Sequence, residues 1–313
     1  RKGAVVVSNP QNGEILALVS SPSFDNNSFT SLTFPRDKRE QELESIFNNP
    51  DLPMFDRAIS GTFPPGSTFK IVVAAAGLES GKITAETTID DPGILIIGPY
   101  KFPNWKYLQD GGRQGILNVV GAIQKSNDIF FYKLGGLIGD DSLFTYAKKF
   151  GLNSKLGIDL PGEATGLVPD KKWREQNGRS WYLGDTYHVA IGQGDLLVTP
   201  LQNNSWTSVV ANGGKLCRPH LVKQSAVSGQ QTAQCRDLGL KKETIDLIRQ
   251  GLVAACSPGG TAYPLFEFKI PARNALARNA SPTDASVSHN DAGGQIACKT
   301  GTAEFGDPNN HTH

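Results

Sequence analysis

The most informative stretch of this chain is Phe63-Pro-Pro-Gly-Ser-Thr-Phe-Lys70, which runs into Ile71-Val-Val-Ala-Ala-Ala76. A Pro-Pro-Gly break before an apolar run predicts a loop that enters a helix, and Ser80-Gly81 predicts where the helix ends. Residues three apart share a helix face, so the Ser67 hydroxyl and the Lys70 amine can meet. A serine at a helix start also lies near free backbone N–H groups, which favour developing negative charge. Ser67 is therefore a candidate nucleophile, with Lys70 as its base.

Two further segments strengthen this interpretation, because S-x-x-K alone occurs by chance in many chains. The first is Lys125-Ser126-Asn127-Asp128, which precedes the apolar run Ile129-Phe-Phe-Tyr132. The second is Lys299-Thr300-Gly301-Thr302, which follows Gln295-Ile-Ala-Cys298. The motifs S-x-x-K, S-D-N and K-T-G, in this order, form the signature of the β-lactamases and penicillin-binding proteins. Three such motifs, widely separated along the chain, indicate a folded active site.

Composition restricts the class of protein. The 313 residues suffice for one large domain or two ordinary ones, and 38% hydrophobic with 19% charged residues is typical of a globular chain with a sizeable core. A net charge of +1 gives no reason to expect nucleic acid binding, which normally needs a concentrated basic face. No apolar run approaches the ~20 residues of a membrane span, and no signal peptide precedes the first strand pattern. An excised piece of an anchored protein would look the same.

The four cysteines, Cys217, Cys235, Cys256 and Cys298, leave two interpretations open. None forms a C-x-x-C pair, which argues against a structural zinc site. They are either four buried free thiols or two disulfides, and the pairing we favour in the second case joins Cys217 to Cys235 and Cys256 to Cys298. Disulfides would indicate an oxidising, extracytoplasmic location.

Hydrophobic periodicity and turn residues predict the elements. Alternation in residues 4–8 and 14–20 around an Asn-Gly turn predicts a hairpin. Helices are expected at residues 67–79, 117–124, 129–137, 141–150, 200–211 and 242–255, with a short one in the charged stretch 36–44. We expect a strand and turns at 90–107, extended chain at 215–222, a polar loop at 270–291 and a strand at 295–303.

The order of these elements predicts an α+β fold. A strand pair, a long mostly helical middle and closing strands lack the βαβ alternation of a parallel sheet. We therefore expect an antiparallel sheet flanked by helices, with a mostly helical insert. Residues 60–215 would form a mostly helical active-site subdomain, and residues 1–59 and 216–313 a sheet subdomain.

The chain resembles the transpeptidase domain of class B penicillin-binding proteins, and among them the elongation-type penicillin-binding protein 2 group. The resemblance covers nearly all of residues 1–313. Besides the three motifs, it is carried by Val5-Val-Val-Ser-Asn-Pro-Gln-Asn-Gly-Glu-Ile-Leu-Ala-Leu-Val-Ser20, Gly157-Ile-Asp-Leu-Pro-Gly-Glu163, Gly192-Gln-Gly-Asp-Leu-Leu-Val-Thr-Pro-Leu-Gln202 and Gly260-Thr-Ala262. It implies a serine β-lactamase/transpeptidase-like fold. Family members continue with further sheet strands, which a chain ending eleven residues after Thr302 would lack.

The resemblance also implies a catalytic role for each motif. Ser67 would attack the carbonyl between the two terminal D-alanines of a peptidoglycan stem peptide and form an acyl-enzyme. Lys70 would take the serine proton, so its pKa must lie below the ~10.4 of a free lysine. Ser126 would relay a proton to the leaving amine. Lys299 would lower the pKa of Lys70 and attract the substrate carboxylate.

The K-T-G segment is implied to bind substrate. Thr300 and Thr302, on either side of Gly301, would hydrogen-bond the terminal carboxylate of the stem peptide. The backbone N–H groups of Ser67 and Thr302 would form the oxyanion hole. An amine from a neighbouring stem peptide would then take the acyl group, which gives the cross-link.

Two positions depart from the commonest family pattern. Asp128 stands where many relatives carry Asn; it would hold Lys70 by charge and could raise its pKa, against a neutral base. Some relatives carry a zinc site near this motif, but Asn104 and the Gly111-Gly112 stretch stand where an Asp and a His are expected. We therefore expect neither a metal nor another cofactor. His311-Thr-His313 is a possible chelating pair at the chain end.

The resemblance implies partners and leaves rival functions. β-Lactam antibiotics would acylate the nucleophile, a glycosyltransferase is the expected partner, and the location would be the extracytoplasmic face of the membrane, with an anchor outside this chain. A serine β-lactamase needs a deacylating base, and no E-x-x-L-N segment occurs between Ser126 and Lys299. A class D-like carboxylated lysine, a D,D-carboxypeptidase and a non-catalytic β-lactam sensor remain open.

Overall fold

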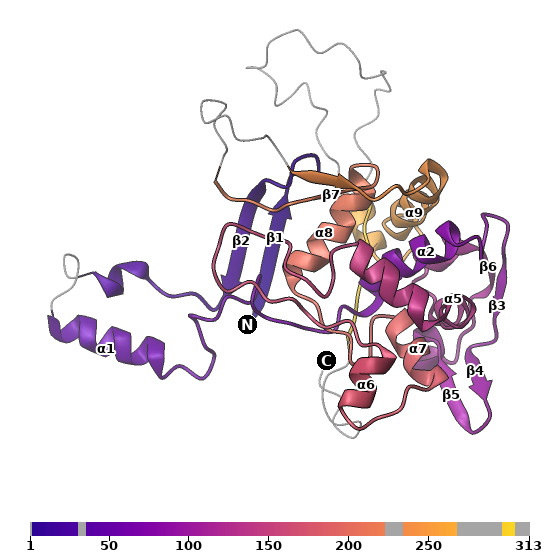
Figure 1. Cartoon of the computed structure of the whole chain (residues 1–313), viewed down its shortest axis with the longest axis horizontal. Coiled ribbons are helices and arrows are strands. Elements are labelled where there is room, and N and C mark those ends of the chain that lie inside the picture. Colours follow the sequence, from indigo (N-terminus) through magenta and orange to yellow (C-terminus); the bar gives the residue numbers. More distant parts are fainter. Residues whose placement is uncertain (1, 31–35, 223–233, 268–295, 304–313) are drawn as a thin grey trace, which may run out of the picture.

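The computed structural model describes residues 2–30, 36–222, 234–267 and 296–303 (Figure 1). Its helices are α1 (Arg36–Phe47), α2 (Lys70–Glu79), α3 (Trp105–Asp110), α4 (Val119–Gln124), α5 (Asp128–Lys149), α6 (Lys171–Gln176), α7 (Leu183–Ala190), α8 (Pro200–Ala211) and α9 (Lys242–Ala255). The strands are β1 (Gly3–Ser8), β2 (Ile15–Ser21), β3 (Ile89–Asp91), β4 (Ile94–Ile97), β5 (Tyr100–Pro103), β6 (Gly115–Leu117), β7 (Lys215–Cys217) and β8 (Cys235–Asp237).

The described strands form four two-stranded antiparallel sheets, β1-β2, β3-β6, β4-β5 and β7-β8. Together with the helices they confirm the predicted α+β class. The hairpin β1-β2 pairs Val5 with Val19 and closes through Gly13, whose φ of 82° suits glycine. Helix α1 projects away from the other elements (Figure 1). The division into a helical and a sheet subdomain stays a prediction.

The helix that follows Ser67 lies at the centre of the core. A 3-10 turn, η2 (Gly66–Phe69), leads directly into α2, and the α2 residues from Lys70 to Leu78 are buried. A helix that is apolar all round must be covered on every side, and α2 contacts α5, α9, α4 and α8. The ring of Phe69 meets that of Trp206 on α8 edge-to-face, at 6.1 Å between centroids. The helix ends at Ser80 before Gly81, as predicted.

Two capped helices, α4 and α5, position the second motif. Asn118 caps α4 by accepting the Gly121 N–H, and Asn127 caps α5 by accepting the Phe130 N–H. The turn between α4 and α5 therefore carries Ser126. Helix α5 is interrupted at Gly139, with φ 77° and ψ 165°, which agrees with the two separate helices predicted here.

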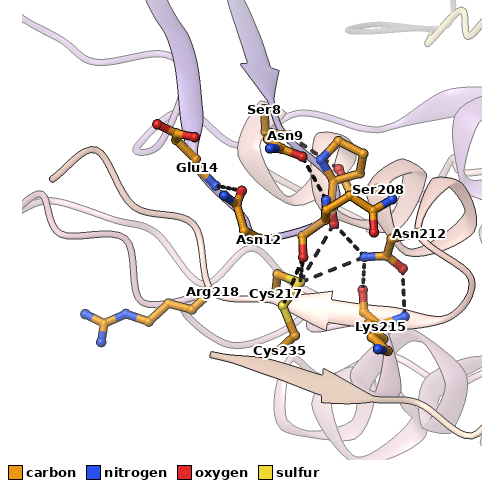
Figure 2. Close-up of a disulfide and its surroundings, with 12 residues drawn as sticks. Ser8, Asn9, Asn12, Glu14, Ser208, Asn212, Lys215, Cys217, Arg218 and Cys235 are labelled. Atoms are coloured by element: carbon orange, nitrogen blue, oxygen red, sulfur yellow. Dashed lines mark hydrogen bonds between the residues drawn. A yellow bond between two sulfur atoms is a disulfide. The ribbon is translucent and has the colours of Figure 1, made fainter. Parts of the chain in front are cut away.

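Both predicted disulfides are present, and the free-thiol alternative is wrong. Cys217 and Cys235 face each other across β7 and β8. Figure 2 shows Asn212 beside this disulfide, where its side chain accepts the Lys215 N–H at 2.8 Å and donates to the Lys215 carbonyl at 2.7 Å. The second disulfide ties Cys256, directly after α9, to Cys298, directly before Lys299.

The strand predicted at 295–303 is wrong over residues 296–303, which form no strand in the described part of the chain. A strand exists only through ladder bonds to a neighbour, and the Cys298 N–H instead donates to the Leu252 carbonyl of α9. The predicted loop at 270–291 and the pair His311 and His313 lie outside the described residues. Among the helices that are described, none is long and apolar enough to cross a bilayer.

Candidate active site

Lys70 is the buried centre of the candidate site. Its side chain is fully buried, and its Nζ donates to Asp128 Oδ1 at 2.6 Å and to the Ser126 carbonyl at 2.8 Å. The amine also lies 5.5 Å from the centre of the Phe131 ring. Burial lowers the pKa of Lys70 below its usual range, and the charge of Asp128 opposes this shift without reversing it. Asp128 therefore raises the pKa of Lys70, as expected, but the effect of burial is larger and the neutral form stays favoured.

Ser126 joins the second motif to the other two. Its backbone is left-handed, with φ 51°, a conformation that costs a non-glycine residue energy and needs support from its surroundings. Its hydroxyl accepts a hydrogen bond from Lys299 Nζ at 2.7 Å, while its carbonyl accepts one from Lys70. Both lysines of the signature therefore contact the same residue.

Lys299 is half-buried, with its ammonium directed inward to Ser126 and to the Thr300 carbonyl, 2.8 Å away. Burial, followed by repulsion from the Lys70 charge, lowers the pKa of Lys299 to about 6, although Asp128 pulls the other way. Burial therefore favours the neutral form of Lys299.

The K-T-G segment lies against the turn that carries Ser67. Gly66 has a φ of 56°, and a Cβ placed on it would overlap the Thr302 carbonyl. A Cβ on Gly301 would lie 2.9 Å from Thr68 Cγ2 and 3.0 Å from the Pro65 carbonyl. The backbones of the first and third motifs are therefore in direct contact, and glycine at both positions allows it.

Ser67 itself lies in η2, where its carbonyl accepts the Lys70 N–H. Its side chain is half-buried, and its hydroxyl has no hydrogen bond within the described ranges. Contact between this hydroxyl and the amine of Lys70 stays a prediction, because the amine is bound to Ser126 and Asp128.

Two family-like segments supply contacts that the motifs alone did not predict. Thr261, from the Gly-Thr-Ala segment, shares a hydrogen bond of 2.7 Å between its hydroxyl and that of Thr300. Gln193, from the Gly-Gln-Gly segment, donates its amide to the Thr302 carbonyl at 3.2 Å. Both segments were visible in the sequence, but their contacts with the third motif were not.

A cluster under the second motif went unpredicted. Asp91 is 2% exposed, and its carboxylate accepts hydrogen bonds from the Gly93 and Gln114 N–H groups and from the side-chain amides of Asn104 and Asn127. Among the described residues, no three His, Cys, Asp or Glu side chains are grouped to hold a metal ion. Asn104, where some relatives were expected to carry a ligand, instead donates to this carboxylate at 2.7 Å.

Comparison with known proteins agrees with this geometry. The family model described as penicillin binding protein transpeptidase domain matches residues 3–313. Peptidoglycan D,D-transpeptidase MrdA of Escherichia coli (strain K12) is 34% identical over 289 residues, which cover 88% of this chain and 44% of the relative.

Two solved structures are similar over nearly the whole chain. Penicillin-binding protein 2 of Helicobacter pylori in complex with MreC gives a TM-score of 0.77 at 31% identity, covering 97% of this chain and 51% of that one. Penicillin-binding protein A of Mycobacterium tuberculosis, as its ceftriaxone acyl-enzyme, gives 0.72 at 27%, covering 97% and 61%. The chain spans about half the length of such relatives. It belongs to the penicillin-binding protein transpeptidase domain family and, within it, to the penicillin-binding protein 2 type.

Proposed function

We propose that this chain is the catalytic domain of a peptidoglycan D,D-transpeptidase that works through an acyl-enzyme on Ser67. The hydroxyl attacks the carbonyl between the terminal D-alanines of a stem peptide, the last D-alanine leaves as an amine, and a second stem peptide takes the acyl group through its own amine. β-Lactams acylate the same hydroxyl, and the acyl-enzyme solved for the M. tuberculosis relative supports this part of the proposal.

Lys70 accepts the Ser67 proton in this mechanism. The residue lies one helical turn after the nucleophile, and burial favours its neutral form. The Asp128 carboxylate, 2.6 Å from the Lys70 amine, holds this amine in one orientation inside the core. Base catalysis therefore relies on a lysine that is fixed by an ion pair yet still able to lose its proton.

Ser126 passes a proton to the leaving amine. Its hydroxyl accepts from Lys299 at 2.7 Å, which leaves the hydroxyl hydrogen free to point at the departing nitrogen. A protonated Lys299 restores that hydrogen, and the substrate carboxylate beside it favours the protonated form.

The third motif binds the substrate. The Thr300 and Thr302 hydroxyls hydrogen-bond the terminal carboxylate, and Gly301 lets the segment approach the Ser67 turn. The backbone N–H groups of Ser67 and Thr302 stabilise the oxyanion; removing one such donor in other enzymes costs roughly 10²–10³ in rate. The contact between the Gly66 and Thr302 backbones supports this assignment, because it brings the two donor residues together.

The observation that carries the proposal is that Lys70 and Lys299 both contact Ser126, one at the carbonyl and one at the hydroxyl. The test is intact-mass analysis of the full-length protein after penicillin treatment, with Ser67→Ala as the matched control. We expect the mass of one penicilloyl group on the wild type and none on the variant. A wild type that folds but stays unlabelled, or a labelled variant, contradicts the proposal.

The lifetime of that adduct separates the rival enzymes. A transpeptidase holds the penicilloyl group for minutes or longer, whereas turnover within seconds would indicate a β-lactamase. A carboxylated Lys70 of the class D kind would place a second anion against Asp128, so the ion pair at 2.6 Å argues against it. A D,D-carboxypeptidase would release stem peptide to water without an acceptor amine.

The cellular location and the partners of the domain are part of the same proposal. Two disulfides suit an oxidising compartment, which supports the extracytoplasmic face of the membrane. The H. pylori relative is solved with MreC, which supports work within an assembly. A glycosyltransferase that supplies the glycan strands is the partner that cross-linking chemistry requires.

A further inference from the structure

The Asp91 carboxylate collects four N–H donors beneath the second motif. Oδ1 accepts the Gly93 N–H at 2.7 Å; Oδ2 accepts the side-chain amides of Asn104 at 2.7 Å and Asn127 at 2.8 Å, and the Gln114 N–H at 3.0 Å. No described cation lies within ion-pair distance of this buried carboxylate. Its negative charge is therefore stabilised by dipoles from four separate points of the chain.

The two amides have fixed orientations. The Asn127 oxygen accepts the Phe130 N–H at 2.6 Å, and the Asn104 oxygen accepts the Asp128 N–H at 3.2 Å. Because main-chain groups can only donate here, the amide nitrogens must turn toward Asp91. Gln114 closes the cluster, since its side-chain oxygen accepts from both amides, at 2.8 and 3.1 Å.

The two asparagines that bind Asp91 also contact the catalytic turn directly. Asn104 holds the backbone of Asp128, and the next residue, Trp105, donates its N–H to Asp128 Oδ2 at 2.8 Å. The other oxygen of Asp128 binds Lys70. Asn127 fixes the start of α5, directly after the left-handed Ser126.

We propose that Asp91 is a positioning residue for the transpeptidase reaction: through Asn104 and Asn127 it holds Ser126 and Asp128 where they can act on Lys70 and the leaving amine. The inference rests on the proposed function. Asp91 itself touches neither Lys70 nor the nucleophile within the described contacts, so its effect passes through the turn.

Asp91→Asn is the direct test, because it keeps the shape of the side chain and removes two acceptor lone pairs. An amide cannot accept all four donors, so one of them loses its bond. Asp90→Asn is the matched control: the same substitution on the same strand, at an exposed side chain. The assay is the second-order rate constant for acylation of the full-length folded protein by a fluorescent penicillin, measured from pH 5 to pH 9 with the melting temperature of each variant.

We expect Asp91→Asn to acylate about 10- to 100-fold more slowly, as a misplaced catalytic group does. We also expect its half-maximal rate at lower pH. Asp128 and Lys299 are the charged groups that face Lys70, and an Asp128 that has moved away no longer raises the pKa of Lys70. Asp90→Asn should match the wild type in both measurements.

An unchanged pH profile in folded Asp91→Asn overturns the inference, whatever its rate, because a purely structural role lowers the rate equally at every pH. If Asp91→Asn does not fold, Asn104→Ala is the second test, because it removes only the connection from Asp91 to the Asp128 backbone. Its acylation rate must also become half-maximal at lower pH, and an unshifted pH profile in this variant overturns the inference. A folded wild type that is never acylated contradicts the proposed function. An Asp91→Asn variant with the rate and pH profile of the wild type contradicts only the role of Asp91.

Discussion

Gly66→Ala tests the contact between the first and third motifs. A Cβ at this position would lie 2.8 Å from the Thr302 carbonyl carbon and closer still to its oxygen. Carbon atoms ordinarily approach to about 3.5–4.0 Å, so Thr302 must retreat from the Ser67 turn by roughly 1 Å. A misplacement of about 1 Å can cost roughly 10² in rate. We therefore expect penicillin acylation of Ser67 to fall about 100-fold.

Backbone strain has to be separated from this displacement. Alanine at the Gly66 φ of 56° costs about 1 kcal/mol by itself, and Gly239→Ala carries the same cost, since Gly239 has a φ of 59° and nothing within 4 Å of its Cβ position. The assay compares acylation rate constants and melting temperatures of both variants. Gly239→Ala should lose a little stability and no rate. A Gly66→Ala protein that acylates within threefold of Gly239→Ala would refute the reasoning.

Four further outcomes are expected. Asp128→Asn should move the acidic limb of the acylation profile to lower pH, because the carboxylate raises the pKa of Lys70; an unmoved limb contradicts this. The free energy of unfolding should rise with pH between about 6 and 10, because the unfolded chain binds the proton that folded Lys299 has lost. Denaturant titrations at several pH values should show a less steep rise in Lys299→Met. Replacing Cys256 and Cys298 by serine should cost about 4 kcal/mol in denaturant unfolding, for a separation of 42 residues, and slow acylation; the matched pair at the β7-β8 disulfide should leave acylation unchanged. EDTA should not alter acylation, since no described cluster offers three metal ligands; loss of activity that zinc restores would contradict this.

Helices were predictable because their signals are local. The bounds of α8 and α9 match the predicted ranges. Thr199 with Gln202 forms a capping box at the start of α8, and apolar residues recur at helical spacing in α9. The hairpin β1-β2 was predictable for the same reason, since its Asn-Gly turn joins two alternating segments.

In the catalytic cluster, the sequence predicted the residues of the three motifs and no others. Ser126 and Asp128 belong to one short motif, but the cluster beneath them joins residues up to 36 positions apart. Hydrogen bonds between loops leave no periodic pattern, so neither Asp91 nor Gln114 gave a signal. The resemblance required a lowered pKa for Lys70, but the sequence could not show that burial is the main cause, because burial depends on the packing of α2 among its neighbours.

The third motif is held in the site by tertiary contacts, although the strand predicted for it is absent from the described residues. The segment was predicted as a strand, yet in the described chain three of its residues are held by other parts of the molecule. Cys298 is held by its disulfide to Cys256 and its N–H bond to α9, Thr300 by the Thr261 hydroxyl, and Thr302 by the Gln193 amide and the Gly66 backbone. These residues lie on both sides of Lys299, so its amine has little freedom to leave Ser126. The position of this motif is therefore set by tertiary contacts, and changes in α9 or at Gly66 should reach the chemistry as directly as changes in the motif itself.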